Sequence, residues 1–580
     1  MIYEETLAHI DSRRLISKFK RKLPRNNEYK NRLHLELQLI IKKKFVDYLL
    51  QVVEILDLVN DIPHIIRGSS GSSLVCYSLG ITNIDPIKEN ICFARFLNEK
   101  RESMPDIDID FPYNKREKVF KRLNKKYPNK IARISNHIYY KEKSATREAI
   151  RNVMIEIEGK SKFIPKNKCN INYKKEWKDL IIKKKKELLG EFKTYSLHCG
   201  GIVYYPDGIP EEIKLKNIKD GVLDNQIVYN KDDISNYKLF KIDILSNRGL
   251  AQLYGSDMLY PNIEDYPDIL DKKITKLFKF GMNIGLTFAE SPAMRKLLTI
   301  VEPKNLQEIA ICLALVRPMV ESKFSILNDF ENYDKYIIFD DDAIRFIKNK
   351  LSCSDDKADE IRRVYAKRKF KKINYYNKIF DVFLVDKLKN LEKYSFCKSH
   401  AISYAKLVLA LAYQKIYKPK EFWVSTLKHC HSMYAKWVHY REASKYIELT
   451  LSNNLQSNNN IINNMQSINN PFSQLKEYGY WISKEFLPNM YLKIGNARED
   501  GFECTFRGLI AMFRIHKKSG KTFITIGYDN YRYVDLIIDE IYKYKKNIIC
   551  GKGILRNYIK NNKKLNLNSN GLLINVIHLE

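Results

Sequence analysis

A segment in which acidic and apolar residues alternate strictly, 104–111 (MPDIDIDF), constrains most strongly how this chain folds. Such alternation is typical of a β-strand, and alternate side chains of a strand lie on the same face. We therefore expect Asp106, Asp108 and Asp110 to project together, while the apolar residues between them anchor the strand in a core. Neighbouring carboxylates repel one another, so this strand is expected to need cations.

The chemistry that fits this strand is metal binding by oxygen ligands. Mg²⁺ prefers such ligands, and two ions about 4 Å apart can serve both the attacking and the leaving oxygen of a phosphoryl transfer. One alternative is a calcium-binding loop, which also opens with DxDxD, but Phe111 stands where that loop requires Gly and Pro112 follows it. The other alternative is a solvated acidic strand edge, which the segment alone does not exclude.

The Gly/Ser turn at 67–73 (RGSSGSS) is a second candidate site, between a short apolar run and a helical pattern. Small residues let backbone N–H groups approach phosphate oxygens, and the N-terminus of a following helix favours anions. The turn matches neither the Walker loop nor the dinucleotide-binding fingerprint. By itself it predicts only a turn.

Two further segments carry polar residues at suggestive positions. In the run LFKIDIL, Lys241 and Asp243 share one strand face, so the aspartate could complete a metal site and the lysine could meet a phosphate. A surface salt bridge is the simpler interpretation. Further on, Ser399 is predicted as the N-cap of a long apolar helix that ends before Pro419. Its neighbours in the KSH tripeptide are expected to be structural.

The chain is strongly basic, with 101 Lys and Arg against 68 Asp and Glu and a formal net charge of +33. This excess predicts a polyanionic partner, with nucleic acid ahead of an anionic membrane surface. Codon bias in an AT-rich genome is an alternative source of the lysines. The excess is densest at 160–186, where eleven lysines accompany Glu176 and Asp179.

Cysteine spacing and apolar runs bear on cellular setting. The ten cysteines include no CxxC pair, so neither a zinc site nor a disulfide framework is indicated. The longest apolar runs, near 309–316 and 407–413, are far shorter than the about 20 residues that a membrane helix needs. We therefore expect a protein of a reducing, cytoplasmic compartment with no membrane partner.

Secondary-structure patterns divide the chain into recognisable stretches. Helices are expected at 33–60 and over most of 250–425, including a capped helix at 354–369, and short strands at 200–205 and 239–245. The tract 452–470 holds nine asparagines and is interpreted as a linker. After Asn496, short strands and a hairpin (HKKSGKTFITI) favour a small barrel of the oligonucleotide-binding type. Four of its residues are expected to be exposed and to stack on or lie beside unpaired bases: Tyr528, Tyr531, Arg532 and Tyr533.

Taken together and in their order, these segments resemble the C-family DNA polymerases, represented by the alpha subunit of bacterial DNA polymerase III. The segments that carry the resemblance are RGSSGSSLVCYSLGITNIDP, ARFLNEKRESMPDIDIDF, HCGGIVYYP, NQIVYNKDDI, KLFKIDIL, FAESPAMRKL, RPM, ADEIRRVYAKR, YSFCKSHAISYA, KPKEF and CTFRGLIAMFRIHKKSGKTFITI. The resemblance covers roughly residues 30–430 and 475–580. So many motifs in one order make it highly specific.

The resemblance implies roles for particular residues. Asp106 and Asp108 match the two metal-binding aspartates of the family's catalytic strand and Asp243 matches the third, so the implied cofactors are two Mg²⁺ ions. Asp110 matches an acidic position that is not usually counted as a ligand. The residues implied to hold the triphosphate, or aligned with basic residues of the family, are Arg67, Gly68, Ser69, Lys241, Arg147 and Arg151.

Several features depart from the family's pattern. Its glycines after the RGS tripeptide are replaced at Ser70 and Ser72, with Gly71 shifted, which suggests a stiffer turn. An acidic-amide triplet of the fingers is here Asp340–Asp342. The chain begins where the family's palm begins, so the N-terminal phosphoesterase-like domain is expected to be missing, and the clamp-binding region to be reduced. Such trimming suggests a phage or mobile-element enzyme that acts in a bacterial cell.

The implied fold class is a multidomain α/β protein. Its palm carries a nucleotidyltransferase-type, polymerase-beta-like mixed sheet, joined by a thumb insertion, helical fingers and a C-terminal OB-like β-barrel. The expected domains are a palm in two parts (1–135 and 198–250), a basic thumb insertion (136–197), helical fingers (251–425), a reduced linker and clamp-binding region with the Asn-rich tract (426–495), and the barrel (496–580).

The implied function is template-directed DNA polymerisation in replication, by two-metal phosphoryl transfer to a primer 3′ end. The alternatives are template-independent nucleotidyl transfer on the same palm and a catalytically inactive DNA-binding scaffold. Expected partners are primer–template DNA, deoxynucleoside triphosphates, a sliding clamp and a separate proofreading exonuclease. We expect no proofreading by the chain itself, because His429 and His431, the one HxH-type pair in the sequence, lack a nearby carboxylate cluster and are interpreted as structural.

Overall fold

A computed structural model describes residues 9–579 apart from 101–104, 160–174, 214, 218–224, 238, 318–322, 390, 392–395, 430, 450–470, 479, 483–485, 499, 543–546 and 558–571. The chain divides into two compact units, Glu117–Leu245 and the combination of Met1–Arg116 with Ser246–Glu580. The predicted Asn-rich linker and the first part of the predicted lysine-rich stretch, 160–174, lie outside the described residues.

The unit 117–245 is built on a mixed sheet in which β7, β4, β3, β6 and β5 are neighbours in that order. The β3–β6 pair is parallel and the other three pairs are antiparallel. The strands are β3 (Ile131–Tyr139), β4 (Phe192–Tyr204), β5 (Leu215–Asn217), β6 (Asn225–Ile227) and β7 (Lys241–Asn247). The helices are α6 (Arg116–Lys126), α7 (Glu142–Glu158), α8 (Lys175–Leu188) and α9 (Lys231–Asn236). The strands predicted at 200–205 and 239–245 are confirmed as parts of β4 and β7.

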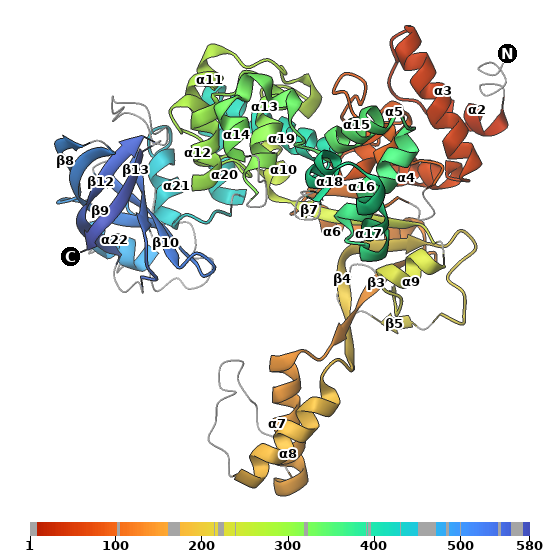
Figure 1. Ribbon diagram of the computed structural model, residues 1–580, viewed down its shortest axis with the longest axis horizontal. Helices are drawn as coiled ribbons and strands as arrows, with labels where there is room; N and C mark the ends of the chain where they lie inside the picture. The colour runs from red at the N-terminus through yellow and green to blue at the C-terminus, as the bar shows by residue number, and fades with distance from the viewer. Residues whose placement is uncertain are drawn as a thin grey trace. The chain divides into compact units, whose positions relative to one another are not determined.

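Helices α7 and α8 lie side by side beyond the ends of β3 and β4 (Figure 1). They share a small apolar core of Ala149, Ile150, Val153 and Ile181. Two ion pairs join the helices, Lys184 to Glu156 at 2.8 Å and Lys185 to Glu142 at 2.5 Å. Part of the basic charge predicted for this region is therefore engaged within the helix pair.

The other unit begins with helices that precede a pair of antiparallel strands. In chain order these elements are α2 (Ile10–Ile16), α3 (Asn27–Lys42), α4 (Val46–Leu58), β1 (Ile65–Arg67), η1 (Ser69–Ser72), α5 (Leu74–Ser78), η2 (Phe93–Arg95) and β2 (Ile107–Pro112). The helices predicted at 33–60 are confirmed as α3 and α4, and the alternating segment is confirmed as β2. The β1–β2 register sets Arg67 opposite Asp108 and Ile65 opposite Asp110.

A helical region follows, with the largest apolar core of the described chain. Its elements are α10 (Arg248–Leu253), η3 (Ile263–Asp265), α11 (Lys272–Lys279), α12 (Pro292–Val301), α13 (Leu306–Leu315), α14 (Lys323–Asn328), η4 (Phe330–Lys335), α15 (Asp340–Leu351), α16 (Asp355–Ala366), α17 (Phe370–Ile379), α18 (Val382–Lys389), α19 (Lys398–Tyr417), α20 (Pro419–His429) and α21 (Lys436–Ala443). Helices α15 to α18 enclose a separate core. The predicted capped helix is confirmed as α16, because the Ser354 side chain accepts a hydrogen bond from the Lys357 N–H.

Helix α19 is apolar on almost every face and is buried along most of its length. Its end before Pro419 is confirmed, since proline cannot continue a helix without losing a hydrogen bond. The prediction that Ser399 is its N-cap is wrong. The N-cap is Cys397 and the helix begins at Lys398, two residues earlier than predicted, and the Ser399 hydroxyl instead donates to the carbonyl of Gly68 at 2.6 Å.

The C-terminal elements are α22 (Pro471–Tyr478), β8 (Tyr491–Arg498), β9 (Gly501–His516), β10 (Lys521–Asp529), β11 (Arg532–Ile538), β12 (Ile548–Asn557) and β13 (Leu572–Leu579). Strand β9 pairs with both β10 and β12, and β11 and β13 complete the connection, so five strands close into a ring. The predicted hairpin is confirmed as β9–β10, with His516 opposite Lys521. No helix of the described ranges is long and apolar enough to cross a membrane.

Candidate active site

Of the two proposed metal ligands on this side of the site, Asp108 lies near the start of β2 and Asp106 lies directly before the strand. Asp106 and Asp108 are half-buried, whereas Ile107 and Ile109 between and beyond them are fully buried. Asp110 continues the acidic face, but it is fully buried and hydrogen-bonded to other side chains. The strand therefore offers two partly accessible carboxylates rather than the three that alternation alone predicts.

The Gly/Ser turn lies against this carboxylate pair. Gly68 adopts a φ of +83°, a conformation that favours glycine, and a Cβ atom added there would lie 3.3 Å from Oδ2 of Asp108. The turn continues as the short helix η1, in which the hydroxyls of Ser70 and Ser72 are buried without a hydrogen-bond partner among the described residues. The structure thus brings Gly68 and Asp108 together, and leaves little room for a larger residue at 68.

The helix that follows the turn differs from the sequence-based expectation. We expected its N-terminus to be open to an anion, but the buried carboxylate of Glu36 already accepts hydrogen bonds from the N–H groups of Leu74 (2.9 Å) and Val75 (3.0 Å). It also accepts from the Ser73 hydroxyl and pairs with Arg32 at 2.6 Å. A protein carboxylate therefore satisfies the start of α5, so any phosphate contact must come from the turn itself.

In the unit 117–245, Asp243 occupies β7 beside a buried lysine. Its Oδ2 accepts a hydrogen bond from Lys241 Nζ at 2.7 Å, and both residues are largely buried. The simpler interpretation of a surface salt bridge is therefore wrong, because the pair is an interior one. Within the described part of the chain, no hydrogen bond reaches Oδ1 of Asp243.

His198 lies next to this pair, with its Nδ1 atom 3.9 Å from Oδ1 of Asp243. That nitrogen accepts hydrogen bonds from the N–H groups of Gly200 (3.3 Å) and Gly201 (2.8 Å), which fixes a neutral ring with its proton on Nε2. Burial lowers the pKa of His198, and Lys241 adds to the effect against the opposing charge of Asp243. The imidazole therefore stays neutral beside the carboxylate.

The remaining predicted phosphate contacts, Arg147 and Arg151, lie one helical turn apart on α7. Arg151 pairs with Glu148 at 3.2 Å, and Arg147 Nε donates to the Lys143 carbonyl at 3.3 Å. Across the described residues, no three His, Cys, Asp or Glu side chains form a ready metal-binding group. Asp106 and Asp108 belong to one compact unit and Asp243 to the other.

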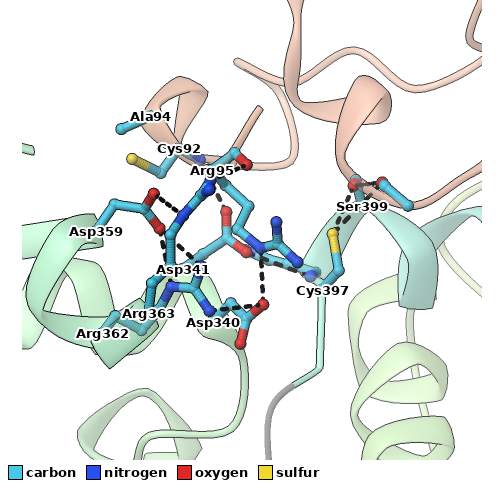
Figure 2. Close-up of polar contacts among 12 residues, drawn as sticks. Cys92, Ala94, Arg95, Asp340, Asp341, Asp359, Arg362, Arg363, Cys397 and Ser399 are labelled. Atoms are coloured by element: carbon cyan, nitrogen blue, oxygen red, sulfur yellow. Dashed lines mark hydrogen bonds and ion pairs between the residues drawn. The ribbon is translucent and has the colours of Figure 1, made fainter. Parts of the chain in front are cut away.

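In the second acidic cluster, Asp340–Asp342, the first two aspartates are part of a buried network (Figure 2), whereas Asp342 is half-buried. Asp340 pairs with Arg95 at 2.7 Å and with Arg362 at 3.3 Å. Asp341 accepts from the N–H groups of Cys92 and Lys398, at 3.0 and 3.3 Å. Asp340 and Asp341 therefore join residues 92–95 to the starts of α15 and α19, whereas Asp342 accepts from the N–H groups of Ile338 and Phe339 at the start of its own helix.

The aromatic surface predicted for the C-terminal sheet is largely wrong. Tyr528 and Tyr533 are only 7% and 1% exposed. Tyr533 instead stacks on Trp437 of α21, with ring centroids 6.2 Å apart. Tyr531 is half-buried beside Lys445, and Arg532 alone of the four is exposed, so this set cannot form a stacking platform.

Two family models match the chain. That of the bacterial DNA polymerase III alpha NTPase domain matches residues 5–246, and that of the finger domain of the same subunit matches residues 261–384. The first match includes the Gly/Ser turn and all three candidate aspartates. The chain belongs to the bacterial DNA polymerase III alpha family.

Curated members of this family align over most of the chain. The DNA polymerase III subunit alpha of Ureaplasma parvum is 28% identical over 494 residues, covering 73% of this chain and 49% of that protein. The subunit of Aquifex aeolicus is 28% identical, covering 69% of this chain and 41% of that protein. The error-prone DNA polymerase of Bdellovibrio bacteriovorus is 27% identical, covering 67% and 42%. The chain thus spans about half the length of these relatives, or less.

Sequence reasoning missed several residues around the candidate site of this polymerase-family chain. Glu36, His198 and Tyr404 received no role, although each contacts a predicted element of the site. Only His198 had a local signal, the two glycines that follow it, whose added Cβ atoms would clash with neighbouring atoms. Glu36 lies 38 residues before Leu74, and Tyr404, although inside the segment YSFCKSHAISYA, lies 294 residues from Asp110, so folding alone brings each of them to its partner.

Proposed function

We propose that this chain is a template-directed DNA polymerase that adds deoxynucleotides to a primer 3′ end. The observation that carries the proposal is the close contact of Gly68, in a phosphate-type turn, with Asp108 of the acidic strand. The family match supports it, because its members bear the names DNA polymerase III subunit alpha and error-prone DNA polymerase. Both names describe the synthesis of DNA.

We infer that Asp106, Asp108 and Asp243 together hold two Mg²⁺ ions. The residues present fit such ions, because all three supply carboxylate oxygens and because Oδ1 of Asp243 is buried with no hydrogen bond among the described residues. Bound Mg²⁺ would supply charge stabilisation to the attacking and leaving oxygens. This assignment follows the resemblance residue by residue.

The protein's own groups prepare the substrate. Gly68 and Ser69 present backbone to the triphosphate, and the absence of a side chain at 68 permits close approach. Arg67 and Lys241 supply fixed positive charge for phosphate oxygens. Helix α7 carries Arg147 and Arg151, which we assign to the phosphates of the substrates. Together these groups orient the nucleotide and offset its charge without covalent participation.

DNA binding is assigned to two further regions. Helices α7 and α8 form the proposed thumb, whose exposed lysines would contact the sugar-phosphate backbone rather than bases. The closed five-stranded ring has the strand order β9-β10-β11-β13-β12 and is proposed as an oligonucleotide-binding barrel for single-stranded template. The proposed domains are a palm in two parts (1–135 and 198–250), a thumb insertion (136–197), helical fingers (251–425), a linker and clamp-binding region (426–495) and the barrel (496–580). A sliding clamp and a separate exonuclease are proposed protein partners.

Primer extension tests the proposal and separates it from its two rivals. The purified chain is incubated with a labelled primer, Mg²⁺ and all four deoxynucleotides, with and without a template strand. Extension that requires the template supports the proposal. Extension of a lone single strand would indicate template-independent nucleotidyl transfer. DNA binding without extension would indicate an inactive scaffold.

A further inference from the structure

Asp110, the third carboxylate of the acidic strand, is the meeting point of three side chains from different elements. Its Oδ1 accepts hydrogen bonds from both Nε (2.9 Å) and Nη2 of Arg67, on β1. Its Oδ2 accepts from Asn247 Nδ2 at 2.9 Å and from the hydroxyl of Tyr404, on α19, at 2.7 Å. Four hydrogen bonds thus converge on a carboxylate that is 0% exposed.

These bonds set Asp110 apart from its neighbours on the strand. An ionised carboxylate has about four lone-pair sites, and here all are engaged. Nε and Nη2 of Arg67 both donate to Oδ1 of Asp110, so one edge of the guanidinium is fixed against the carboxylate. The Arg67 side chain remains 30% exposed, so the rest of the group faces away from Asp110. Asp110 and its neighbours raise the pKa of Arg67 despite its burial.

Helix α19 is hydrogen-bonded to β1 and to the Gly/Ser turn that follows it. The hydroxyls of Ser399 and Ser403, one helical turn apart, donate at 2.6 Å to the carbonyls of Gly68 and Ile66. Tyr404 is the next residue, and its ring packs on His400 and Phe288 at centroid distances of 4.7 and 4.5 Å. Helix α19, the Gly/Ser turn and Arg67 are therefore parts of one hydrogen-bonded assembly.

We propose that Asp110 is a positioning residue, which uses the Tyr404 hydroxyl to lock Arg67 in the orientation that receives the phosphates of an incoming nucleotide. This inference rests on the proposed function. It assigns Asp110 a role in nucleotide affinity and gives Tyr404, far away in sequence, a share in it. Burial and the nearby Asp110 raise the pKa of Tyr404, so the phenol stays a hydrogen-bond donor throughout the working pH range.

The variant Tyr404→Phe tests the lock, because it removes the hydroxyl and keeps the ring contacts. Loss of one hydrogen bond to a charged group corresponds to about ten-fold or more in an equilibrium constant. We expect the KM for deoxynucleotide to rise about ten-fold, while kcat changes less than about three-fold. The affinity for primer–template should stay unchanged, whereas the melting temperature should fall, because the buried carboxylate of Asp110 loses one hydrogen bond. A merely structural role would lower the melting temperature and leave the KM for deoxynucleotide unchanged.

Tyr413→Phe is the matched control. Tyr413 lies on the same helix and is 4% exposed, whereas Tyr404 is half-buried, and the Tyr413 hydroxyl donates to the Ile269 carbonyl at 3.4 Å, away from Asp110. We expect its nucleotide KM to equal that of the unmodified chain. A rise in KM equal to that of Tyr404→Phe would mean that any loosening of α19 suffices, and would overturn the role of the Asp110–Tyr404 bond.

A double-mutant cycle with Arg67→Lys links the effect to the guanidinium. Lysine keeps the charge but cannot grip one oxygen with two nitrogens. If Tyr404 acts through Arg67, then Tyr404→Phe has little further effect in the Arg67→Lys background, and the two changes are not additive. Additive changes in KM, or no change for Tyr404→Phe alone, would overturn the proposal. In those outcomes the unmodified chain still extends primers and the proposed function stands.

Direct binding of a deoxynucleotide to a complex with a dideoxy-terminated primer completes the test. If Tyr404→Phe weakens the affinity for the deoxynucleotide by the same factor as it raises KM, the positioning role of Asp110 and Tyr404 is supported. An unchanged affinity contradicts that role. If the unmodified chain neither extends a primer nor binds nucleotide, the proposed function fails and this inference fails with it.

Discussion

Two acidic clusters of this chain carry the same kind of side chain in opposite surroundings. Asp106, directly before β2, and Asp108, near its start, are half-buried, and Asp108 lies beside the glycine turn. Asp340 and Asp341 are at most 1% exposed, and their oxygens accept from arginine side chains or backbone N–H groups (Figure 2). The first cluster suits metal and substrate, and the second joins secondary-structure elements.

The difference shows that the role of an acidic run depends on the residues that pack around it in the fold rather than on its own sequence. A buried carboxylate costs much solvation and persists only when it is paired and hydrogen-bonded. Asp359 shows the same pattern, with bonds from Arg362, Arg363 and Asn98. Within such a network, a carboxylate contributes to structure and is not free to bind a substrate.

The largest expected effect separates the clusters by activity. Asp108→Asn should lower the rate of primer extension by about 10³-fold or more, because a lost charge at the transition state costs at least about 4 kcal/mol. Its free energy of unfolding should barely change. Single-turnover extension with Mg²⁺, and its loss on chelation with EDTA, are the measurements. Near-normal extension by this variant would show that β2 is not part of the active site.

The second prediction concerns stability in the buried cluster. Asp340→Asn leaves Arg95 and Arg362 without a shared carboxylate, and breaking a buried pair costs about 3–5 kcal/mol. Urea unfolding should show this loss. The control is Asp386→Asn, whose pair with Lys389 is exposed on both sides and should contribute about 0–1 kcal/mol. Equal effects of the two variants would mean that burial does not distinguish these ion pairs.

The third prediction uses pH. Burial, with the nearby charge of Asp340, raises the pKa of Asp341 above its ordinary value of 3.8. The folded chain therefore binds this proton more readily than the unfolded chain, and the contribution of Asp341 to stability falls as pH rises from about 4 through the raised pKa. The unfolding free energy of Asp341→Asn, relative to the unmodified chain, should rise over that window. A difference that is constant between pH 4 and 7 would contradict the assignment.

The smallest expected effect extends the comparison to basic residues. On α8, Lys184 and Lys185 pair with glutamates of α7, whereas Lys183 and Lys186 are exposed and have no ion pair in the described part of the chain. Changing Lys183 and Lys186 to Gln should reduce the salt dependence of DNA binding, by up to about 0.9 in slope for each lost phosphate contact.

The paired lysines provide the matched control for this measurement. Changing Lys184 and Lys185 to Gln removes the same formal charge, but we expect a smaller change in slope because these side chains are engaged with Glu156 and Glu142. DNA affinity is measured for both double variants over a series of salt concentrations. Identical slopes for the two would show that only total charge matters.

Local patterns in the sequence were enough to predict many elements and the family. The strict alternation of 104–111 predicted β2, the capping residue Ser354 predicted α16, and Pro419 marked the end of α19. These predictions succeeded because period, capping and proline geometry act over a few residues. The ordered motifs likewise identified the DNA polymerase III alpha family before any fold was known.

Only the tertiary structure decided which polar groups are buried and hydrogen-bonded to other parts of the chain. Tyr528 and Tyr533, which were expected at the surface, are buried in the folded chain. At the start of α5, the carboxylate of Glu36 accepts the backbone hydrogen bonds that an anion was expected to accept. The tertiary structure also gave Asp110 and Asp341 partners hundreds of residues away, such as Tyr404 for Asp110. The physical reason is that solvation and hydrogen bonding depend on which distant segments pack together, and no local pattern encodes that packing.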